Sequence, residues 1–296
     1  MRILNFGSMN MDYVYSVDHM AAPGETISSA KLELFCGGKG LNQSIALARA
    51  GAPVYHAGMV GSDGEMLLHA CAENGVDTKH IQKSAERSGH AIIQVDQSGE
   101  NCIVLCGGAN QALKKETVDT VLHEFGAGDW LLVQNELNMV DYIIDAAYER
   151  GMRIALNPSP YHEAIKQWGL QKVSLFLINE IEGNQLTGGA SPEEILAAMQ
   201  CVYPDASVVL TLGGKGVMLQ EGTSIFTQTP FKTNAIDTTA AGDTFTGYYL
   251  AAILEGMPQT QALERAAYAA SLAVSRKGAS ASIPYRQEIE AGLSQK

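Results

Sequence analysis

The stretch Asp237–Tyr249, Asp-Thr-Thr-Ala-Ala-Gly-Asp-Thr-Phe-Thr-Gly-Tyr-Tyr, most constrains what this chain can fold into. Three small residues, Ala240–Gly242, predict a backbone turn that a ligand can approach closely. One face of a helix then follows at the spacing i, i+4, i+7 and i+8: Phe245, Tyr249, Ala252 and Ile253. A helix that begins at such a turn presents unpaired N–H groups and the positive end of its dipole, so the stretch predicts an anion site.

Asp243 falls in the first turn of this predicted helix, beside the anion site. A carboxylate in that position suits a base that removes a hydroxyl proton during phosphoryl transfer, while N–H groups stabilise charge on the transferred group. Acidic residues are also common in the first turn of ordinary helices. The stretch by itself therefore leaves a catalytic and a structural interpretation open.

Size and charge narrow the class of protein. The chain has 296 residues, of which 46% are hydrophobic and 18% charged, as in an ordinary globular protein with one large α/β domain or two smaller ones. Its net charge of −12 argues against nucleic acid as a general partner. A local phosphate site remains compatible with this charge, because backbone N–H groups bind phosphate without cationic side chains.

Cysteine usage and hydropathy bear on location. Five cysteines are present, an odd number without a C-x-x-C pair, which predicts free thiols in a reducing compartment: Cys36, Cys71, Cys102, Cys106 and Cys201. No pattern of a signal peptide or a membrane span is visible. We therefore expect a cytoplasmic protein with no membrane partner.

Strand and helix patterns alternate along most of the chain after Gly108. This alternation predicts a single α/β domain over residues 1–296, with a doubly wound, mostly parallel central sheet flanked by helices. Polar residues follow the predicted strands, as Asn179 and Glu182 do after residues 175–178. At the carboxyl edge of an open sheet such residues bind ligands, although the spacing of this pair alone favours a surface turn.

Two β-rich segments interrupt the alternation, at about residues 12–36 and 88–108. The second contains Ala91–Val95 and Cys102–Cys106, joined by polar residues with hairpin chemistry. We expect the two segments to form a small second sheet, the alternative being two ordinary strands of the main sheet. Apolar residues in the hairpin predict that one face is covered: Ile92, Ile93, Ile103, Val104 and Leu105.

Polar residues also follow the first predicted strand, Ile3–Phe6. Asn10 and Asp12 are two residues apart, so an extended backbone points both to one side, either into a crevice or into solvent. The glycine cluster Gly37–Gly40 then opens a helix that presents Asn42 in its first turn. The chain contains neither G-x-x-x-x-G-K-[ST] nor G-x-G-x-x-G, which excludes a Walker A loop and disfavours a dinucleotide-dependent dehydrogenase.

Three of these motifs together resemble the ribokinase (PfkB) family of sugar kinases. The family's Gly-Gly-Lys-Gly-x-Asn-Gln signature stands at Gly37–Gln43, and its Thr-Ala-Ala-Gly-Asp-Thr-Phe signature at Thr239–Phe245. The ribokinase version of a third region, Gly-Ser-x-Asn-x-Asp, stands at Gly7–Asp12. The resemblance runs from Gly7 to about Glu288. It implies a ribokinase-like fold in which the small sheet is a lid over the sugar and often a dimer contact.

The resemblance also implies roles for individual residues. For the sugar it implies Asn10, Asp12, Gly38, Lys39, Asn42 and, in a looser match, Glu136. For catalysis it implies Asp243 as the base, with an anion hole of backbone N–H groups from Ala240, Ala241, Gly242 and Asp243 itself. For ATP and its Mg²⁺ it implies Asn179, Glu182, Thr211, Gly213, Gly216 and Gly242. For a K⁺ activator it implies Asp237, Thr239, Ala273, Arg276, Gly278 and Ser282.

The function expected from this resemblance is transfer of the γ-phosphoryl group of ATP to the 5-hydroxyl of D-ribose, by a homodimer joined through the lid sheet. Other acceptors stay open: deoxyribose, a ketohexose, a nucleoside or a sugar acid. His90 either alters the lid wall or is an ordinary exposed histidine of a strand. A non-catalytic sugar or nucleotide sensor is a further alternative, but it predicts damage to Asp243 or to the anion hole, and the sequence has none.

Overall fold

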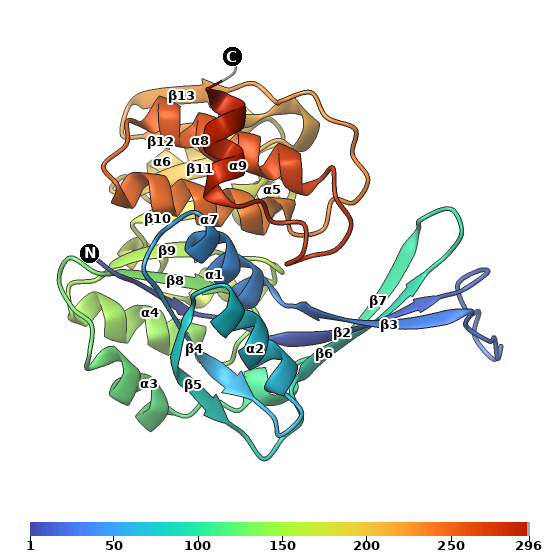
Figure 1. Cartoon of the computed structure of the whole chain (residues 1–296). Helices are drawn as coiled ribbons and strands as arrows, with labels where there is room; N and C mark the ends of the chain where they lie inside the picture. Colours follow the sequence, from blue (N-terminus) through green and yellow to red (C-terminus); the bar gives the residue numbers. More distant parts are fainter. Residues whose placement is uncertain (295–296) are drawn as a thin grey trace.

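The computed structural model describes residues 1–294, and its strands form a nine-stranded and a four-stranded sheet in that range (Figure 1). The central sheet has the order β13-β12-β11-β10-β9-β8-β1-β4-β5. Its strands are β1 (Ile3–Phe6), β4 (Val54–Val60), β5 (Asp77–Lys83), β8 (Trp130–Gln134), β9 (Arg153–Asn157), β10 (Leu175–Asn179), β11 (Ser207–Thr211), β12 (Val217–Glu221) and β13 (Ser224–Gln228). All neighbouring pairs from β5 to β11 are parallel, and β12 and β13 add an antiparallel edge. The predicted fold class is confirmed.

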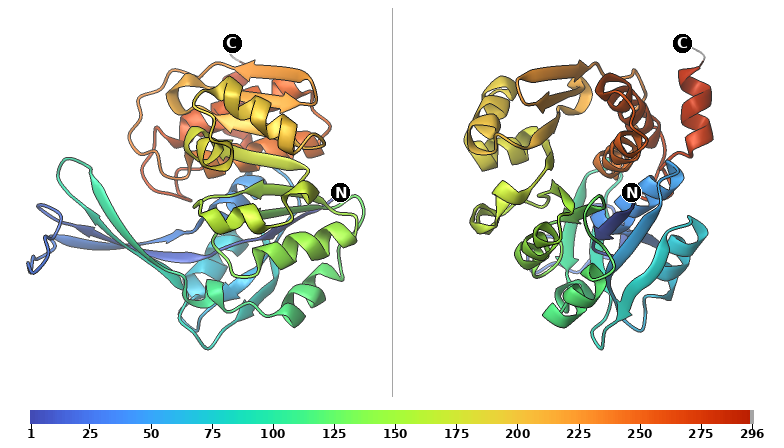
Figure 2. Two further views of the ribbon diagram at one scale, coloured as in Figure 1. Left: turned by 180° about the vertical axis from the view of Figure 1, so that it is seen from behind. Right: turned by 90° about the vertical axis from the view of Figure 1, so that its left-hand side faces the viewer.

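Side chains on the central strands alternate between two buried cores. In β8, Trp130 and Leu132 belong to one core, and Leu131 and Val133 to the other. One core is covered by α1 (Lys39–Arg49), α2 (Glu65–Glu73), α7 (Ala241–Leu254), α8 (Gln259–Ala273) and α9 (Arg286–Leu293), and the other by α3 (Lys115–Leu122), α4 (Val140–Glu149), α5 (Glu180–Thr187) and α6 (Pro192–Val202) (Figure 2). A strand that is buried on both faces carries apolar side chains at consecutive positions, because helices cover both sides of a parallel sheet.

The order in which the chain adds strands to the central sheet reverses between the parallel strands β1 and β8. From β1 the chain proceeds through α1 to β4 and β5 on one side, and from β8 through α4 to β9 on the other. The two connecting helices pack on opposite faces. Ligands of open α/β sheets bind at such a switch point, outside the carboxyl ends of the strands. The fold therefore predicts a site directly beyond Phe6 and Gln134.

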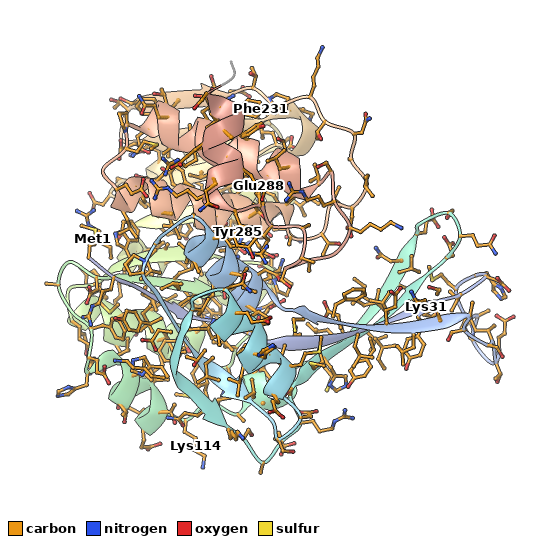
Figure 3. The ribbon with its side chains drawn as sticks, in the orientation of Figure 1. Met1, Lys31, Lys114, Phe231, Tyr285 and Glu288 are labelled. Carbon is orange, nitrogen blue, oxygen red and sulfur yellow. The ribbon has the colours of Figure 1, made fainter. Side chains whose placement is uncertain are left out.

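The four-stranded sheet, here called the lid sheet, projects from the body as an arm. It has the order β3 (Lys31–Gly37), β2 (Asn10–Ser16), β6 (Gly89–Val95) and β7 (Asn101–Cys106), and Lys31 lies toward its outer end (Figure 3). The sequence predicted a covered apolar face on this sheet. In the single chain four of the residues behind this prediction are 41–62% exposed: Ile103 and Leu105 line the cavity, and Ile92 and Val104 lie on the opposite, outer face.

One prediction about a helix needs correction. The helix that starts at Ala241 was expected to bury one face, yet residues 243–252 are all buried, because α7 packs against both α1 and α8. Helix α8 ends at Ala273, and α9 follows it. None of the helices in residues 1–294 has the length and apolar character that a bilayer crossing requires.

Candidate active site

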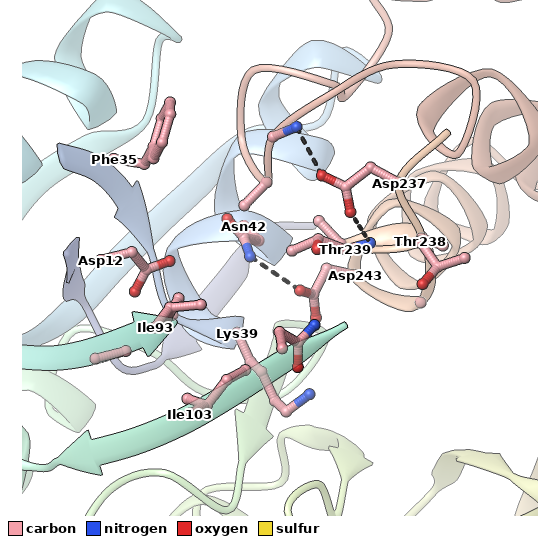
Figure 4. Close-up of a pocket in the computed structure, with 18 of the residues that line it drawn as sticks. Asp12, Phe35, Lys39, Asn42, Ile93, Ile103, Asp237, Thr238, Thr239 and Asp243 are labelled. Carbon is pink, nitrogen blue, oxygen red and sulfur yellow. Dashed lines mark hydrogen bonds between the residues drawn. The ribbon is translucent and has the colours of Figure 1, made fainter. Parts of the chain in front are cut away.

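A cavity of about 1020 Å³ opens at the switch point, between the central sheet, the start of α7 and the inner face of the lid sheet (Figure 4). Residues from every predicted subsite line it: Asn10, Asp12, Gly38, Lys39, Asn42, Glu136, Asn179, Glu182, Thr211, Asp237, Thr239, Ala240, Ala241, Gly242, Asp243 and Gly278. Two of these residues, Asn10 and Asp243, are 233 positions apart in the chain. The fold thus brings together most of the residues that the sequence singled out.

Five predicted site residues are not among those that line the cavity: Gly213, Gly216, Ala273, Arg276 and Ser282. Gly213 and Gly216 form the turn after β11, where the N–H of Leu212 donates to the carbonyl of Gly216. Arg276 forms an ion pair with Glu288 at 2.5 Å. The buried hydroxyl of Ser282 donates to the carbonyl of Ala279 at 2.8 Å.

The start of α7 is the chemical centre of the cavity. Ala240 adopts a left-handed backbone with φ 59°, which costs a non-glycine residue about 1–2 kcal/mol and turns the chain into the helix. Asp243 is the third residue of α7 and is only 7% exposed. The space beside Gly242 is open to an anion, because a Cβ built on this glycine finds no atom within 4 Å, while the N–H of Ala241 donates to the carbonyl of Thr238 at 3.3 Å.

Two amide groups hold the Asp243 carboxylate. The Nδ2 of Asn42 donates to one carboxylate oxygen at 3.1 Å, and the Nε2 of Gln43 donates to the other at 2.9 Å. Both donors come from α1, which packs against α7. The Oδ1 of Asn42 is buried and has no hydrogen-bond partner within residues 1–294. Because an unpaired buried acceptor is costly, this oxygen suits a hydroxyl donor from a ligand.

Gln43 was missed as a site residue, although it is the last residue of the signature at Gly37–Gln43. Its Nε2 also donates to Asn157 Oδ1 at 3.2 Å, and its Oε1 accepts from Gln134 Nε2 at 2.7 Å. Gln134 donates in addition to Asn5 Oδ1 at 3.0 Å. No local pattern identifies Asn5, Gln134 or Asn157, because the hydrogen bonds that connect them to one another and to Gln43 span 91 to 129 positions of the chain.

Asn10 and Asp12 reach the cavity from β2, at the base of the lid sheet. The Oδ1 of Asn10 accepts from Asn110 Nδ2 at 2.7 Å, so Asn10 presents its NH₂ group as the part free for a ligand. Asn110, another residue that the sequence did not indicate, also accepts from the N–H of Met9 at 3.0 Å. Asp12 packs over Gly37, where a Cβ would lie 2.0 Å from its Oδ2. Only glycine leaves room for this carboxylate.

Carboxylates crowd the sugar side of the cavity. Burial, together with the charge of Glu136, raises the pKa of Asp12 to about 7. Glu136 accepts from the Ser8 hydroxyl and from the N–H of Lys39, and burial raises its pKa as well. Burial alone would lower the pKa of Lys39, but the nearby carboxylates of Asp243, Glu136 and Glu182 raise it on balance. These groups suit a neutral ligand with many hydroxyls.

The Asn179 and Glu182 pair forms the start of α5 rather than a surface turn. Asn179 Oδ1 accepts from the N–H of Glu182 at 2.9 Å, and Glu182 Oε2 accepts from the N–H of Asn179 at 3.0 Å. This reciprocal arrangement is a capping box. Both residues still line the cavity. The same pair can therefore stabilise a helix start and face a ligand.

Two loops meet behind the anion site. The Asp237 carboxylate accepts from the N–H of Thr239 at 2.9 Å and from the N–H of Gly278 at 2.9 Å (Figure 4). It thereby joins the segment before α7 to the loop after α8. In the part of the chain that the structure describes, no three His, Cys, Asp or Glu side chains gather as a metal site would require. A cation between these loops would depend on backbone carbonyl oxygens.

The site combines a buried carboxylate, a helix N-terminus and a polar pocket at the switch point of a doubly wound sheet. This combination is typical of a phosphotransferase with an alcohol acceptor. The sequence matches the pfkB family of carbohydrate kinases over residues 2–286. The chain belongs to this family and is a sugar kinase.

Curated and solved relatives agree with this assignment over the whole fold. The chain is 38% identical to the ribokinase of Haemophilus influenzae over 291 residues, 95% of each chain. It is similar to the crystal structure of ribokinase from Thermotoga maritima, with TM-score 0.90, 31% identity and 99% of each chain covered. It is also similar to Arabidopsis thaliana ribokinase complexed with ribose and ATP, with TM-score 0.89, 29% identity and coverage of 99% and 98%.

Proposed function

We propose that the protein transfers the γ-phosphoryl group of ATP to the primary 5-hydroxyl of D-ribose, giving ribose 5-phosphate. The observation that carries the proposal is the buried Asp243 carboxylate, which faces one cavity together with the helix N-terminus and the sugar-side residues. The similarity to the ribokinase of Haemophilus influenzae and to a ribokinase complexed with ribose and ATP supports the choice of substrates.

In the proposed reaction Asp243 removes the proton of the acceptor hydroxyl. Backbone N–H groups of Ala240–Asp243 stabilise the charge that develops on the transferred group. Asn10, Asp12, Gly38, Lys39, Asn42 and Glu136 hold the sugar hydroxyls. Because transfer is in line, these residues act mainly by positioning the acceptor oxygen against the γ-phosphorus.

ATP and Mg²⁺ are assigned to the side of the cavity that is lined by Asn179, Glu182 and Thr211. One carboxylate in that region, Glu182, suits Mg²⁺ that is held mostly by water and by ATP oxygens. Gly213 and Gly216 adjoin Thr211 and would approach the nucleotide only from the edge of the site. We assign K⁺ to the two loops that Asp237 joins, where Thr239, Ala273, Arg276, Gly278 and Ser282 would supply mainly carbonyl oxygens.

The test is ADP release from Mg²⁺-ATP over a panel of sugars, each measured with K⁺ and with Na⁺. Turnover restricted to D-ribose and faster with K⁺ is the expected result. Turnover with deoxyribose, a ketohexose, a nucleoside or a sugar acid would keep the mechanism and replace the acceptor. We expect Asp243→Asn to lower kcat by about 10²–10⁴-fold while sugar binding persists. Near-normal turnover of this variant would remove Asp243 from the mechanism.

We further propose that two copies associate through the outer face of the lid sheet. Leu32, Leu34, Ile92 and Val104 are exposed on strands of that sheet, and burial of apolar surface of this kind stabilises a dimer. His90 pairs with Cys106 on the same sheet and is not among the residues that line the cavity, which supports its interpretation as an ordinary histidine of a strand. A cytoplasmic location stays a prediction of the sequence.

A further inference from the structure

A connected set of amides lies beside Asp243, three of them buried and outside the cavity lining and one, Asn157, part-buried and among the residues that line the cavity. It consists of Asn5, Gln43, Gln134 and Asn157, and here it is called the amide network. Its members come from four elements, β1, α1, β8 and β9, which meet at the switch point. Asn5 and Gln43 are fully buried and Gln134 is 1% exposed. Buried polar groups of this kind are stabilising only when their hydrogen bonds are mutually consistent.

Backbone carbonyls at both ends of the amide network fix the direction of its hydrogen bonds. Asn5 Nδ2 donates to the carbonyl of Gly40 at 2.8 Å, and a carbonyl can only accept, so Asn5 Oδ1 must face Gln134. At the other end, Asn157 Nδ2 donates to the carbonyl of Leu177 at 2.8 Å, so Asn157 Oδ1 must face Gln43. If either amide turned over, its oxygen would face a backbone carbonyl oxygen, and neither of the two oxygens could donate a hydrogen bond.

These fixed ends determine the orientation of the two glutamines between them. Gln134 Nε2 faces two acceptors, Asn5 Oδ1 at 3.0 Å and Gln43 Oε1 at 2.7 Å. Its own Oε1 is buried without a partner within the described chain, an arrangement that costs free energy and is not explained by packing alone. With its Oε1 held by Gln134, Gln43 has only its NH₂ group left for Asp243 and Asn157.

We propose that Gln43 is a positioning residue for the base, and that Gln134 sets its orientation. Gln43 holds one oxygen of the Asp243 carboxylate in a fixed plane, so that the base meets the acceptor hydroxyl without first reorganising. A turned-over Gln43 would instead direct its oxygen at the carboxylate and repel it. This proposal rests on the role of Asp243 in the proposed function, and it assigns Gln43 no contact with substrate.

The experiment is a double-mutant cycle on Gln43→Met and Asp243→Asn, read as the single-turnover rate of sugar phosphate formation. We expect Gln43→Met to lower this rate about 10- to 100-fold, as loss of one hydrogen bond to a charged group does, with the KM values of sugar and ATP within about threefold. In the Asp243→Asn background the same change should have little further effect, because Gln43 acts only through the carboxylate. Gln220→Met, a buried glutamine of β12 outside the cavity, is the matched control and should leave the rate unchanged.

Equal fold losses from Gln43→Met in the two backgrounds would overturn the proposal, as would an unchanged rate in Gln43→Met while Asp243→Asn is impaired. If Asp243→Asn keeps the wild-type rate, the base assignment itself fails, and that outcome is distinct. Should Gln43→Met not fold, Gln43→Glu preserves size and still accepts from Gln134. A carboxylate beside Asp243 should move the acidic limb of the rate–pH profile upward by about one pH unit or more. An unmoved limb in Gln43→Glu would contradict the proposed contact.

Discussion

Sugar binding should release a proton from Asp12, because the empty site holds this carboxyl group at a pKa of about 7. Burial is the main cause of the raised pKa, and the charge of Glu136 adds to it. Sugar hydroxyls that donate to the ionised carboxylate would favour its charged form and lower the pKa again. Affinity for the sugar should therefore rise as the pH rises through 7.

The size of the effect follows from the shift. If the bound sugar returns the pKa of Asp12 to near its ordinary value of 3.8, binding releases about 0.9 proton at pH 6, about 0.5 at pH 7 and about 0.1 at pH 8. The dissociation constant of the sugar should then be about tenfold larger at pH 6 than at pH 8. Glu136, whose pKa is also raised, would add a smaller release of its own.

Isothermal titration calorimetry in buffers of different ionisation enthalpy measures this proton release directly, without ATP, using the sugar that supports turnover. Asp12→Asn is the control, since it retains the shape of the side chain but cannot ionise, and only the contribution of Glu136 should remain. Proton uptake on binding, or tighter binding at pH 6 than at pH 8, would refute the reasoning.

The folded, empty protein should also lose stability relative to Asp12→Asn as the pH rises from about 4 to 7, because the unfolded chain ionises Asp12 first.

Three further perturbations have separable outcomes. Gly242→Ala should keep the melting temperature, since the added Cβ meets no atom within 4 Å. The methyl group should nevertheless lower kcat/KM for ATP at least about tenfold by blocking the helix N-terminus, and an unchanged kcat/KM would contradict the anion site. Asn110→Asp should raise the KM of the sugar about tenfold and leave the KM of ATP unchanged, because Asn10 would turn its NH₂ group toward the new carboxylate. Equal changes in both KM values would indicate general damage to the fold. Val104→Lys should shift the protein from dimer to monomer in sedimentation velocity, whereas the control Ile181→Lys, at a 70% exposed position on α5, should not. A monomeric parent protein would exclude the proposed dimer.

Local chemistry made the start of α7 predictable. The small residues before Asp243 and the apolar spacing after it are both visible within one stretch of sequence, and the structure has Asp243 as the third residue of the helix. A capping box such as that of Ser191 and Glu194 is a local pattern of the same kind, since its two partners lie three residues apart. The lid sheet was also predictable, because its strands carry alternating β-prone residues and a hairpin linker.

Other features depend on long-range contacts that no local pattern records. The burial of α7 on all sides follows from its position between α1 and α8, not from its own residue spacing. The role of Gln134 is equally invisible, because its partners Asn5 and Gln43 lie on other elements, 129 and 91 positions away. Sequence signatures could indicate which residues approach a ligand, but not which residues hold those residues in place.

The division of the site between two bodies has a consequence for how the sugar is recognised. Asp12 belongs to β2 of the lid sheet, whereas Asp243 belongs to α7 of the main body. Glu136 follows β8 and accepts from both Ser8 and the N–H of Lys39, so it joins the base of the lid sheet to the start of α1. In the empty site burial and the charge of Glu136 raise the pKa of Asp12, burial and the charge of Asp243 raise the pKa of Glu136, and the cost of ionising both groups falls when hydroxyl donors arrive. A polyhydroxyl ligand is neutral and supplies such donors, whereas an anionic acceptor such as a sugar acid would add a further negative charge to the cavity that Asp12, Glu136 and Asp243 line. The crowding of carboxylates therefore favours a neutral sugar over a sugar acid among the acceptors that the fold can hold.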